Sequence, residues 1–166
     1  MVGAKLYYPD DTIQHAGVVV GLGGVAAHVL CKLPRDAEGY MGRLRCVQEI
    51  SAVTAACMMV KTSVFKAVGG FDEELKVAFN DIDLCMKVRK YGVKIVFTPY
   101  AELYHYESKS RGMEDTPEKQ LRFSREVNCF RRKWERELLK GDPYYNPNLT
   151  LKSTDCSLRK QEKNGD

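Results

Sequence analysis

Four consecutive residues, Asn80-Asp81-Ile82-Asp83, have the types and spacing that could carry out acid–base chemistry. They follow the segment GGFDEELKVAF and begin a stretch whose apolar residues recur at helical spacing, so we expect them in the first turn of a helix. The positive end of the helix dipole favours an ionised carboxylate at that place. Asp81 could therefore act as a general base at neutral pH. The alternative is that Asn80 or Asp81 only caps the helix.

A glycine-rich segment is the second pattern with chemical potential. In VVVGLGGVA, Gly21, Gly23 and Ala26 match the phosphate-binding spacing G-x-G-x-x-A after an apolar strand. However, Pro34 would cut the following helix short, and no acidic residue ends a second strand about 20 residues further on. We therefore expect a glycine-rich turn or bulge here and not a dinucleotide site.

The elements that must position Asp81 follow from the hydrophobic pattern, which alternates between strand-like and helix-like periods. Residues 53–60 form a continuous apolar run of strand length, which is typical of a strand buried on both faces. The last 16 residues are polar, and we expect them to fray. In chain order we expect strands at 2–8, 18–20 and 53–60, a helix capped by Thr62 and ended by Gly69-Gly70, a helix from Asn80 to Gly92, and extended segments at 93–97 and 101–106.

The longest predicted helix runs from about Pro117 to Lys140, with an apolar stripe formed by Phe123, Val127, Phe130, Trp134 and Leu138. We expect Phe130 and Trp134 to be buried and to anchor it. Residues 109–140 hold ten Lys/Arg and six Asp/Glu, an excess equal to the net charge of +4 of the whole chain. This excess indicates either a solvated helix face or a surface that meets anionic lipid or a phosphorylated substrate.

Composition bounds the class of protein. The chain has 166 residues, of which 44% are hydrophobic and 29% are charged, enough for one domain with a core. The mild net charge does not indicate a nucleic-acid binder. None of the six cysteines forms a CxxC pair or sits at zinc-finger spacing, which favours a reducing compartment over a disulfide framework. The uncharged segment 12–31 contains too many glycines for a spanning helix, and residues 1–11 do not resemble a signal peptide.

Residues 53–112 resemble the C-terminal half of a family 2 glycosyltransferase with the GT-A fold. The similarity rests on an apolar strand, GGFDE, NDIDLC, a strand with a Thr-Pro turn, and HYESKSRG, in that order. The flanks IQHAGVVVGLGG and DPYYNPNL resemble the bacterial subgroup that builds cell-surface polysaccharides, of rhamnan type. The resemblance therefore covers roughly residues 2–150.

This resemblance implies a role for Asp81 as the catalytic base. The base would take a proton from an acceptor hydroxyl as that oxygen attacks the anomeric carbon of a nucleotide-sugar, with inversion in a single displacement. One carboxylate then suffices, in contrast to the paired carboxylates of glycosidases. The departing nucleoside diphosphate implies a divalent cation, Mg²⁺ or Mn²⁺. His105 falls where related enzymes can supply a metal ligand, although a lone histidine on a strand is commonly structural.

The remaining site residues are also placed by the resemblance. Asn80 stands where the family commonly has glutamate, and Arg111 could bind a diphosphate through two hydrogen bonds. Asp83 would orient or cap the helix, while Asp72 would fix the GGFD turn. The residues that we expect to bind acceptor or substrate are Thr54, Asp72, Asn80, Asp83, Ser110 and Arg111.

The expected fold is α/β, a partial GT-A fold with a small mixed sheet, flanking helices and a long C-terminal helix. Residues 1–150 would form the acceptor-side portion of a glycosyltransferase domain, and residues 151–166 a flexible tail. The nucleotide-binding half with its own Asp-x-Asp is missing, so we expect a fragment that is inactive by itself. A surface exposed by that absence could support a homodimer. We expect a cytoplasmic location, peripheral at the inner face of a membrane, a glycan or lipid-linked acceptor, and no nucleic-acid partner.

Two further classes stay open on the sequence alone. One is a non-catalytic binding or assembly module of a larger glycosyltransferase. The other is a dinucleotide-dependent enzyme or a basic RNA-binding domain, which the glycine-rich segment and the basic helix respectively would suggest.

Overall fold

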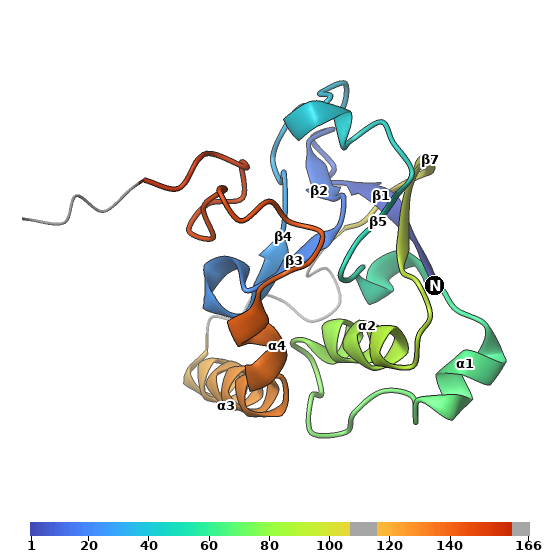
Figure 1. The fold of residues 1–166 in the computed structure, drawn as a ribbon, viewed down its shortest axis with the longest axis vertical. Helices are drawn as coiled ribbons and strands as arrows, with labels where there is room; N and C mark the ends of the chain where they lie inside the picture. The colour runs from blue at the N-terminus through green and yellow to red at the C-terminus, as the bar shows by residue number, and fades with distance from the viewer. Residues whose placement is uncertain (107–115, 161–166) are drawn as a thin grey trace, which may run out of the picture.

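The computed structural model describes residues 1–106 and 116–160, which fold into an α/β structure with a small mixed sheet (Figure 1). The strand order is β2-β1-β7-β5, and β6 pairs with β1 beside β2. A separate hairpin is formed by β3 and β4. The strands are β1 (Val2–Tyr7), β2 (Ile13–His15), β3 (Val18–Val20), β4 (Ala26–His28), β5 (Gln48–Glu49), β6 (Met58–Met59) and β7 (Val96–Tyr104). The predicted α/β class with a small mixed sheet is confirmed.

The parallel pair β1–β7 forms the centre of the sheet. Its register runs from Val2 opposite Val96 to Tyr7 opposite Tyr104, with a shift between Ala4 and Lys5. Three residues of β7, 99–101, are unmatched at this shift, and Pro99 lies among them. Proline has no N–H to give to a neighbouring strand, so a bulge accommodates it. The two extended segments that the sequence predicts are therefore one bulged strand.

The glycine-rich segment connects the two strands of the β3–β4 hairpin. It forms a short 3₁₀ turn, η1 (Leu22–Gly24). Gly21, which precedes this turn, and Gly23 within it have φ of 95° and 65°. Glycine adopts these angles without steric cost. No helix follows the turn, so the predicted glycine-rich turn is confirmed.

Residues 53–60 differ from the buried strand that their apolar run predicts. Val53 is buried, but Thr54 then begins a 3₁₀ turn, η3 (Ala55–Cys57), and β6 pairs with only two residues of β1. Val53 packs directly on the backbone at Gly3, where an added Cβ would come within 2.4 Å of its Cγ1. The chain turns here because this close approach and the Thr54 cap take precedence over strand propensity.

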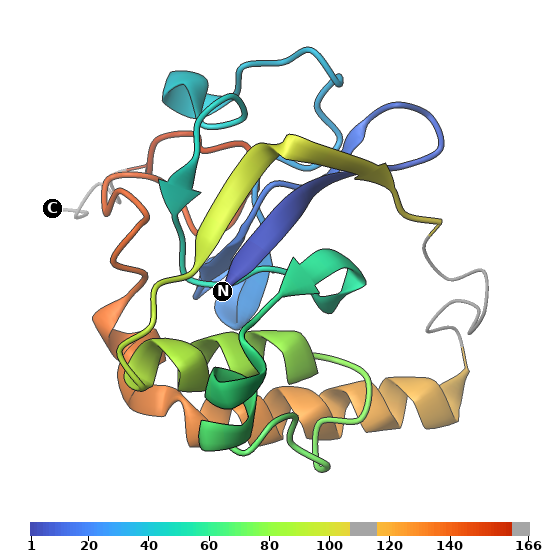
Figure 2. The same cartoon turned by 90° about the vertical axis from the view of Figure 1, so that its right-hand side faces the viewer.

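Helices form the second and third layers of the molecule. α2 (Asn80–Lys90) lies against the sheet, and α3 (Pro117–Lys133) packs on α2 from the far side (Figure 2). The start of α2 agrees with the prediction. In α1 (Thr62–Ala67) the cap is Lys61, so Thr62 is already the first helical residue.

The longest helix is shorter than the sequence predicts. Its backbone leaves helical angles at Trp134, with φ −116° and ψ 21°, and a separate short helix α4 (Glu135–Lys140) follows. Thr116 caps α3 by accepting a hydrogen bond from the Lys119 N–H. Phe130 and Trp134 are buried, as expected.

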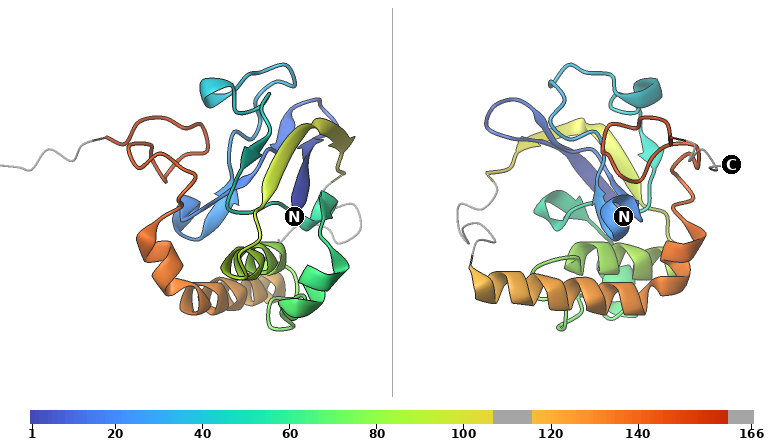
Figure 3. Two further views of the ribbon diagram at one scale, coloured as in Figure 1. Left: turned by 45° about the vertical axis from the view of Figure 1, so that its right-hand side comes forward. Right: turned by 90° about the vertical axis from the view of Figure 1, so that its left-hand side faces the viewer.

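The segment after α4 runs back from the helices towards the strands (Figure 3). Leu149 and Cys156 are buried there, and the N–H of Leu30 donates to the carbonyl of Thr154 at 2.6 Å. Thr150 and Ser157 are also hydrogen-bonded across the segment. Within residues 151–160, Cys156 is therefore buried and Thr154 is hydrogen-bonded to Leu30, while residues 157–160 are exposed. The sequence predicts a flexible tail from 151; residues 161–166 lie outside the described residues.

All six cysteines are free thiols. Cys85 and Cys156 are buried, whereas the others are partly or fully exposed. In the described parts of the chain, no helix combines the length and the apolar character needed to cross a lipid bilayer.

Candidate functional site at the start of helix α2

Asp81 lies in the first turn of α2, at the side of the molecule where β7 ends (Figure 2). Phe79 is the N-cap of α2 and has φ 63° and ψ 4°, a left-handed conformation that redirects the chain into the helix. Its ring is held between those of Phe123 and Phe130, with centroid distances of 5.8 and 5.4 Å. The strained cap is therefore stabilised by aromatic packing from α3.

The carboxylate of Asp81 is half-buried and accepts two backbone hydrogen bonds. Its Oδ2 accepts from the Ala55 N–H at 3.0 Å, and its Oδ1 accepts from the Ile82 N–H at 2.8 Å. The first bond joins α2 to the η3 turn across 26 residues of sequence. These bonds orient the carboxylate and leave oxygen lone pairs with which it can accept a further hydrogen bond.

Thr54, the other residue of this turn among the predicted ones, is held by a buried histidine. Its N–H donates to Nε2 of His15 at 3.4 Å, while its Oγ1 accepts from the Ala56 N–H at 3.3 Å. His15 is fully buried, and its Nδ1 lies 2.9 Å from Nδ1 of His28. Because Nε2 of His15 accepts, its proton is on Nδ1 and donates to His28. Burial, together with the neighbouring His28, holds the pKa of His15 well below its usual value.

His105 directly follows β7 and is tied to strand β2. Its Nδ1 lies 2.8 Å from Oε1 of Gln14, whose Nε2 donates to the His105 carbonyl at 3.2 Å. Within residues 1–106 and 116–160, no three His, Cys, Asp or Glu side chains come together in a way that could hold a metal ion. The described residues therefore do not form a complete metal site around His105.

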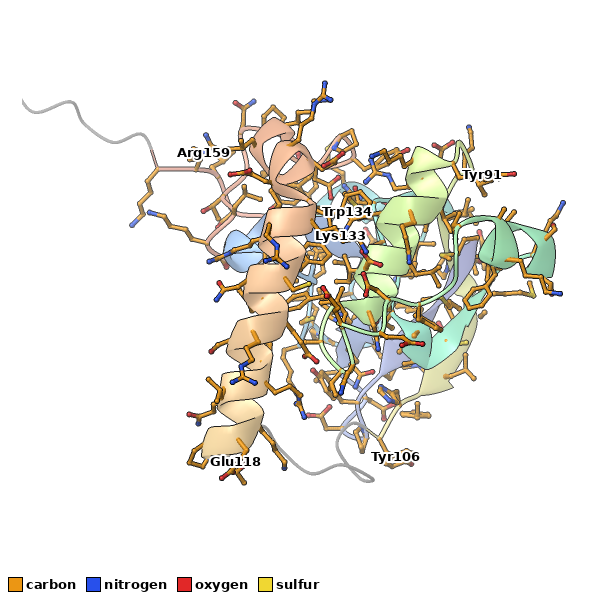
Figure 4. The ribbon with its side chains drawn as sticks, turned by 90° about the horizontal axis from the view of Figure 1, so that it is seen from below. Tyr91, Tyr106, Glu118, Lys133, Trp134 and Arg159 are labelled. Carbon is orange, nitrogen blue, oxygen red and sulfur yellow. The ribbon has the colours of Figure 1, made fainter. Side chains whose placement is uncertain are left out.

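Asp83 lies two residues after Asp81, on the inner side of α2. It is fully buried and accepts a hydrogen bond from Nε1 of Trp134 at 2.8 Å. Two ammonium groups approach the same carboxylate, that of Lys133 at 2.8 Å and that of Lys87 at 3.1 Å. Figure 4 shows Lys133 and Trp134 on the side of α3 that faces α2. Asp83 thus joins the two helices.

Asp72 belongs to the same ionic cluster. Lys133 pairs with it as well as with Asp83, and Asp72 also accepts a hydrogen bond from the Glu74 N–H at 3.0 Å. The hydrogen bond from Lys133 is the main reason why the pKa of Asp72 is lowered. Burial by itself lowers the pKa of the Lys133 ammonium. The hydrogen bonds to Asp72 and Asp83 have the larger combined effect, so the pKa is raised. The GGFD turn is therefore fixed to α3.

The loop that delivers Asn80 and Asp81 is held by a residue that the sequence did not single out. Glu126 on α3 is buried, and its two oxygens accept from the backbone N–H groups of Val77 and Ala78 at 3.1 and 2.9 Å. Glu126 and Lys133 both lie among the apolar residues of the α3 stripe. A charged residue at such a position is a signal that could have identified them.

The structure thus brings only some of the predicted site residues together. Asp81 and the turn that contains Thr54 are in contact, and Asn80 precedes Asp81 in the same helical turn. Asp72 and Asp83 form a separate cluster with Lys133. Ser110 and Arg111 lie outside the described residues.

Comparisons with known proteins place this chain beside proteins of polysaccharide biosynthesis. No model of a known protein family matches the sequence, and no solved structure does. The chain is 39% identical over 166 residues to the O-antigen biosynthesis protein RfbC of Myxococcus xanthus, which covers 99% of this chain and 13% of that protein. It is 59% identical over 158 residues to the uncharacterized protein y4gI of Sinorhizobium fredii, covering 95% of this chain and 17% of that protein.

A shorter match names an enzyme. Over 62 residues, 37% of this chain, the sequence is 36% identical to the N-acetylglucosaminyl-diphospho-decaprenol L-rhamnosyltransferase of Mycobacterium tuberculosis, of which 20% is covered. The chain spans no more than a fifth of the length of any of these relatives.

Proposed function

We propose that this chain is the acceptor-side portion of an inverting glycosyltransferase that transfers a sugar from a nucleotide-sugar to a glycan or a lipid-linked acceptor. The observation that carries the proposal is the carboxylate of Asp81, held at the first turn of α2 by the Ala55 N–H. The names of the relatives, O-antigen biosynthesis protein and rhamnosyltransferase, support the same class of reaction. The resemblance to the GT-A fold and to family 2 belongs to this proposal.

In the proposed reaction, Asp81 accepts the proton of the acceptor hydroxyl while that oxygen forms a bond to the anomeric carbon. The bond from this carbon to the nucleoside diphosphate breaks in the same step, and the configuration inverts. The two backbone hydrogen bonds of the Asp81 carboxylate hold it in one orientation, which reduces the entropy that must be lost in the transition state.

The other parts of the proposal concern groups beyond Asp81 and its hydrogen-bond partners. Because the chain spans at most a fifth of its relatives, we propose that a nucleotide-binding half lies elsewhere in a larger protein and that this chain alone does not turn over. A divalent metal bound partly by His105 stays a prediction. The roles of Ser110 and Arg111 at a diphosphate and a homodimer of the chain also stay predictions.

The test of the proposal is the substitution Asp81→Asn in the protein that carries this chain. Asparagine cannot take a proton, and its one oxygen can accept from only one of the Ala55 and Ile82 N–H groups. Sugar transfer should therefore fall about 10²–10⁴-fold at a temperature at which thermal unfolding shows the variant to be folded. Release of nucleoside diphosphate in the presence of acceptor measures this. The matched control is Asp36→Asn, at an exposed aspartate far along the chain, which should leave transfer unchanged.

A specific observation favours a second candidate, a non-catalytic binding or assembly module of a glycosyltransferase. Both oxygens of Asp81 accept backbone N–H groups, which is also what a purely structural carboxylate at a helix start does. Undiminished transfer by the Asp81→Asn protein would support this module and refute the catalytic base.

A further inference from the structure

The outer side of α3 and α4 carries arginines that the fold does not use. Arg125, Arg132 and Arg136 are exposed, and none of them forms an ion pair with another described residue. On the inner side, by contrast, Lys133 is neutralised by two aspartates. Internal packing therefore does not account for the outer row, which we call the arginine face.

Basic residues outnumber acidic ones on α3 and α4. Residues 117–140 contain eight Lys/Arg and four Asp/Glu. One of the four acidic residues, Glu126, is buried and faces the loop before α2. Arg122 pairs with Glu126, and Lys133 pairs with Asp72 and Asp83. Without Glu126, Arg122 and Lys133, six basic and three acidic residues remain on the two helices, so their other sides keep an excess of positive charge.

Apolar side chains are exposed next to the arginines, and none of the residues three or four positions from these arginines on the helices is aromatic. Leu121 is 53% exposed and Leu139 is 83% exposed. Of the aromatic residues of α3, Phe130 is buried, and Phe123 is 42% exposed but packs against Phe79 on another side of the helix from the arginines. Single-stranded nucleic acids bind through aromatic stacking in addition to phosphate contacts, so leucines among arginines fit a lipid surface better.

A hollow at the junction of α3 and α4 combines the same two kinds of group. It has a volume of about 430 Å³ and lies where the Nε–H of Arg131 donates to the carbonyl of Gly24 at 3.2 Å. It is lined by Gly24, Arg131, Arg132, Glu135, Leu138 and Leu139. Two guanidinium groups against one carboxylate favour an anion, and the leucines favour an attached hydrocarbon chain.

We propose that the arginine face of α3 and α4 docks on the surface of a bilayer that contains anionic phospholipids, with lipid phosphates at the arginines and Leu139 inserted among the headgroups. Each basic side chain near an anionic bilayer strengthens binding by about fivefold. This proposal is independent of the proposed sugar transfer, because it uses no residue of the Asp81 site.

Co-sedimentation with vesicles tests the proposal on the chain itself. We expect binding to phosphatidylcholine vesicles that contain phosphatidylglycerol, weak binding to pure phosphatidylcholine, and loss of binding at high salt. The triple variant Arg125→Glu, Arg132→Glu, Arg136→Glu should bind at least tenfold more weakly. The matched control Arg45→Glu, Lys61→Glu, Lys66→Glu changes the net charge by the same amount at exposed residues outside α3 and α4 and should bind within about twofold of the original chain. Thermal unfolding verifies that both variants fold.

Leu139→Ser separates a lipid surface from soluble polyanions. It should weaken vesicle binding severalfold and leave binding to a short RNA or to inorganic phosphate unchanged. Absence of vesicle binding, or an equal loss in both triple variants, would overturn the proposal. Tighter binding to RNA than to anionic vesicles would replace the lipid by a nucleic acid and overturn it as well.

Discussion

His15 and His28 share one hydrogen bond between their Nδ1 atoms, and His15 also receives the N–H of Thr54. No pattern in the sequence indicates this arrangement, because Thr54 lies 39 positions away and the bond exists only after β2 and the η3 turn have come together. Asp81 is different, since a carboxylate at a helix start can be recognised locally. The sequence therefore identifies the candidate base but not the groups that orient its surroundings.

The buried histidine predicts a loss of stability on mild acidification. The pKa of His15 is lowered in the folded state, mainly by burial, so below about pH 6.5 the unfolded chain binds a proton that the folded chain does not. The free energy of unfolding should therefore fall between about pH 6.5 and pH 5, approaching 1.4 kcal/mol per pH unit. Urea unfolding at several pH values measures this slope.

His15→Gln provides the comparison for this pH dependence. Glutamine keeps an acceptor for the Thr54 N–H but does not titrate, so the slope in this window should flatten. His105→Gln, at a half-buried ring, should retain the slope. An unchanged slope in the His15 variant would show that other groups cause the acid sensitivity.

Among the helices, α3 holds the loop before α2 in place through Glu126. Helical periodicity predicts α3 correctly, but it gives no reason for a break at Trp134, where neither proline nor glycine occurs. The break coincides with a tertiary contact, because the indole N–H of Trp134 donates a hydrogen bond to the buried carboxylate of Asp83. Local propensity contains no information on such a contact, which explains why the predicted helix is too long.

Glu126→Gln tests whether α3 holds this loop in place. The amide can accept only one of the two N–H groups of Val77 and Ala78 through its oxygen, and its own NH₂ opposes the other. We expect a loss of about 2 kcal/mol of unfolding free energy. Amide exchange at Val77 and Ala78 should accelerate more than exchange in the centre of α2. Equal acceleration everywhere would indicate only global destabilisation.

Trp134→Ala removes the anchor at the end of α3. The side chain is buried and hydrogen-bonded to Asp83, so we expect a cost of about 3–5 kcal/mol, measured by chemical unfolding. Trp134→Phe should keep much of the packing but lose the hydrogen bond, so its unfolding free energy should lie between those of the original chain and Trp134→Ala. Leu139→Ala, on the exposed side of α4, should cost less than about 0.5 kcal/mol. A small effect of Trp134→Ala would contradict its role as an anchor.

For the whole molecule, the sequence predicts the α/β class and the order of most helices and strands, because these follow from local periodicity. It does not predict the centre of the sheet, where β1 pairs with a strand more than 90 residues away in parallel. The bulge at Pro99 and the close approach of Val53 to Gly3 depend on that pairing. The prediction of a buried strand at 53–60 is wrong for this reason, since the residues that surround this segment in space, and not its own composition, determine its conformation.

The C-terminal segment gives the prediction that concerns the molecule as a whole. Leu149 and Cys156 are buried, and Thr154 accepts the N–H of Leu30 from the opposite end of the chain. Truncation after Asn148 should therefore lower the unfolding free energy by about 2–4 kcal/mol, since it exposes the apolar surface that this segment covers.

Truncation after Lys160 is the matched control for that experiment and should leave the unfolding free energy within about 0.5 kcal/mol of the original. Urea unfolding of the two truncated chains and the full chain measures the difference. If both truncations had the same small effect, residues 149–160 would be dispensable for the core, and the boundary at residue 150 that the sequence predicts would be the correct one. A large loss after Asn148 alone would extend the folded unit to residue 160, because the two truncated chains differ by the contacts of residues 149–160, which include those of Leu149, Thr154 and Cys156.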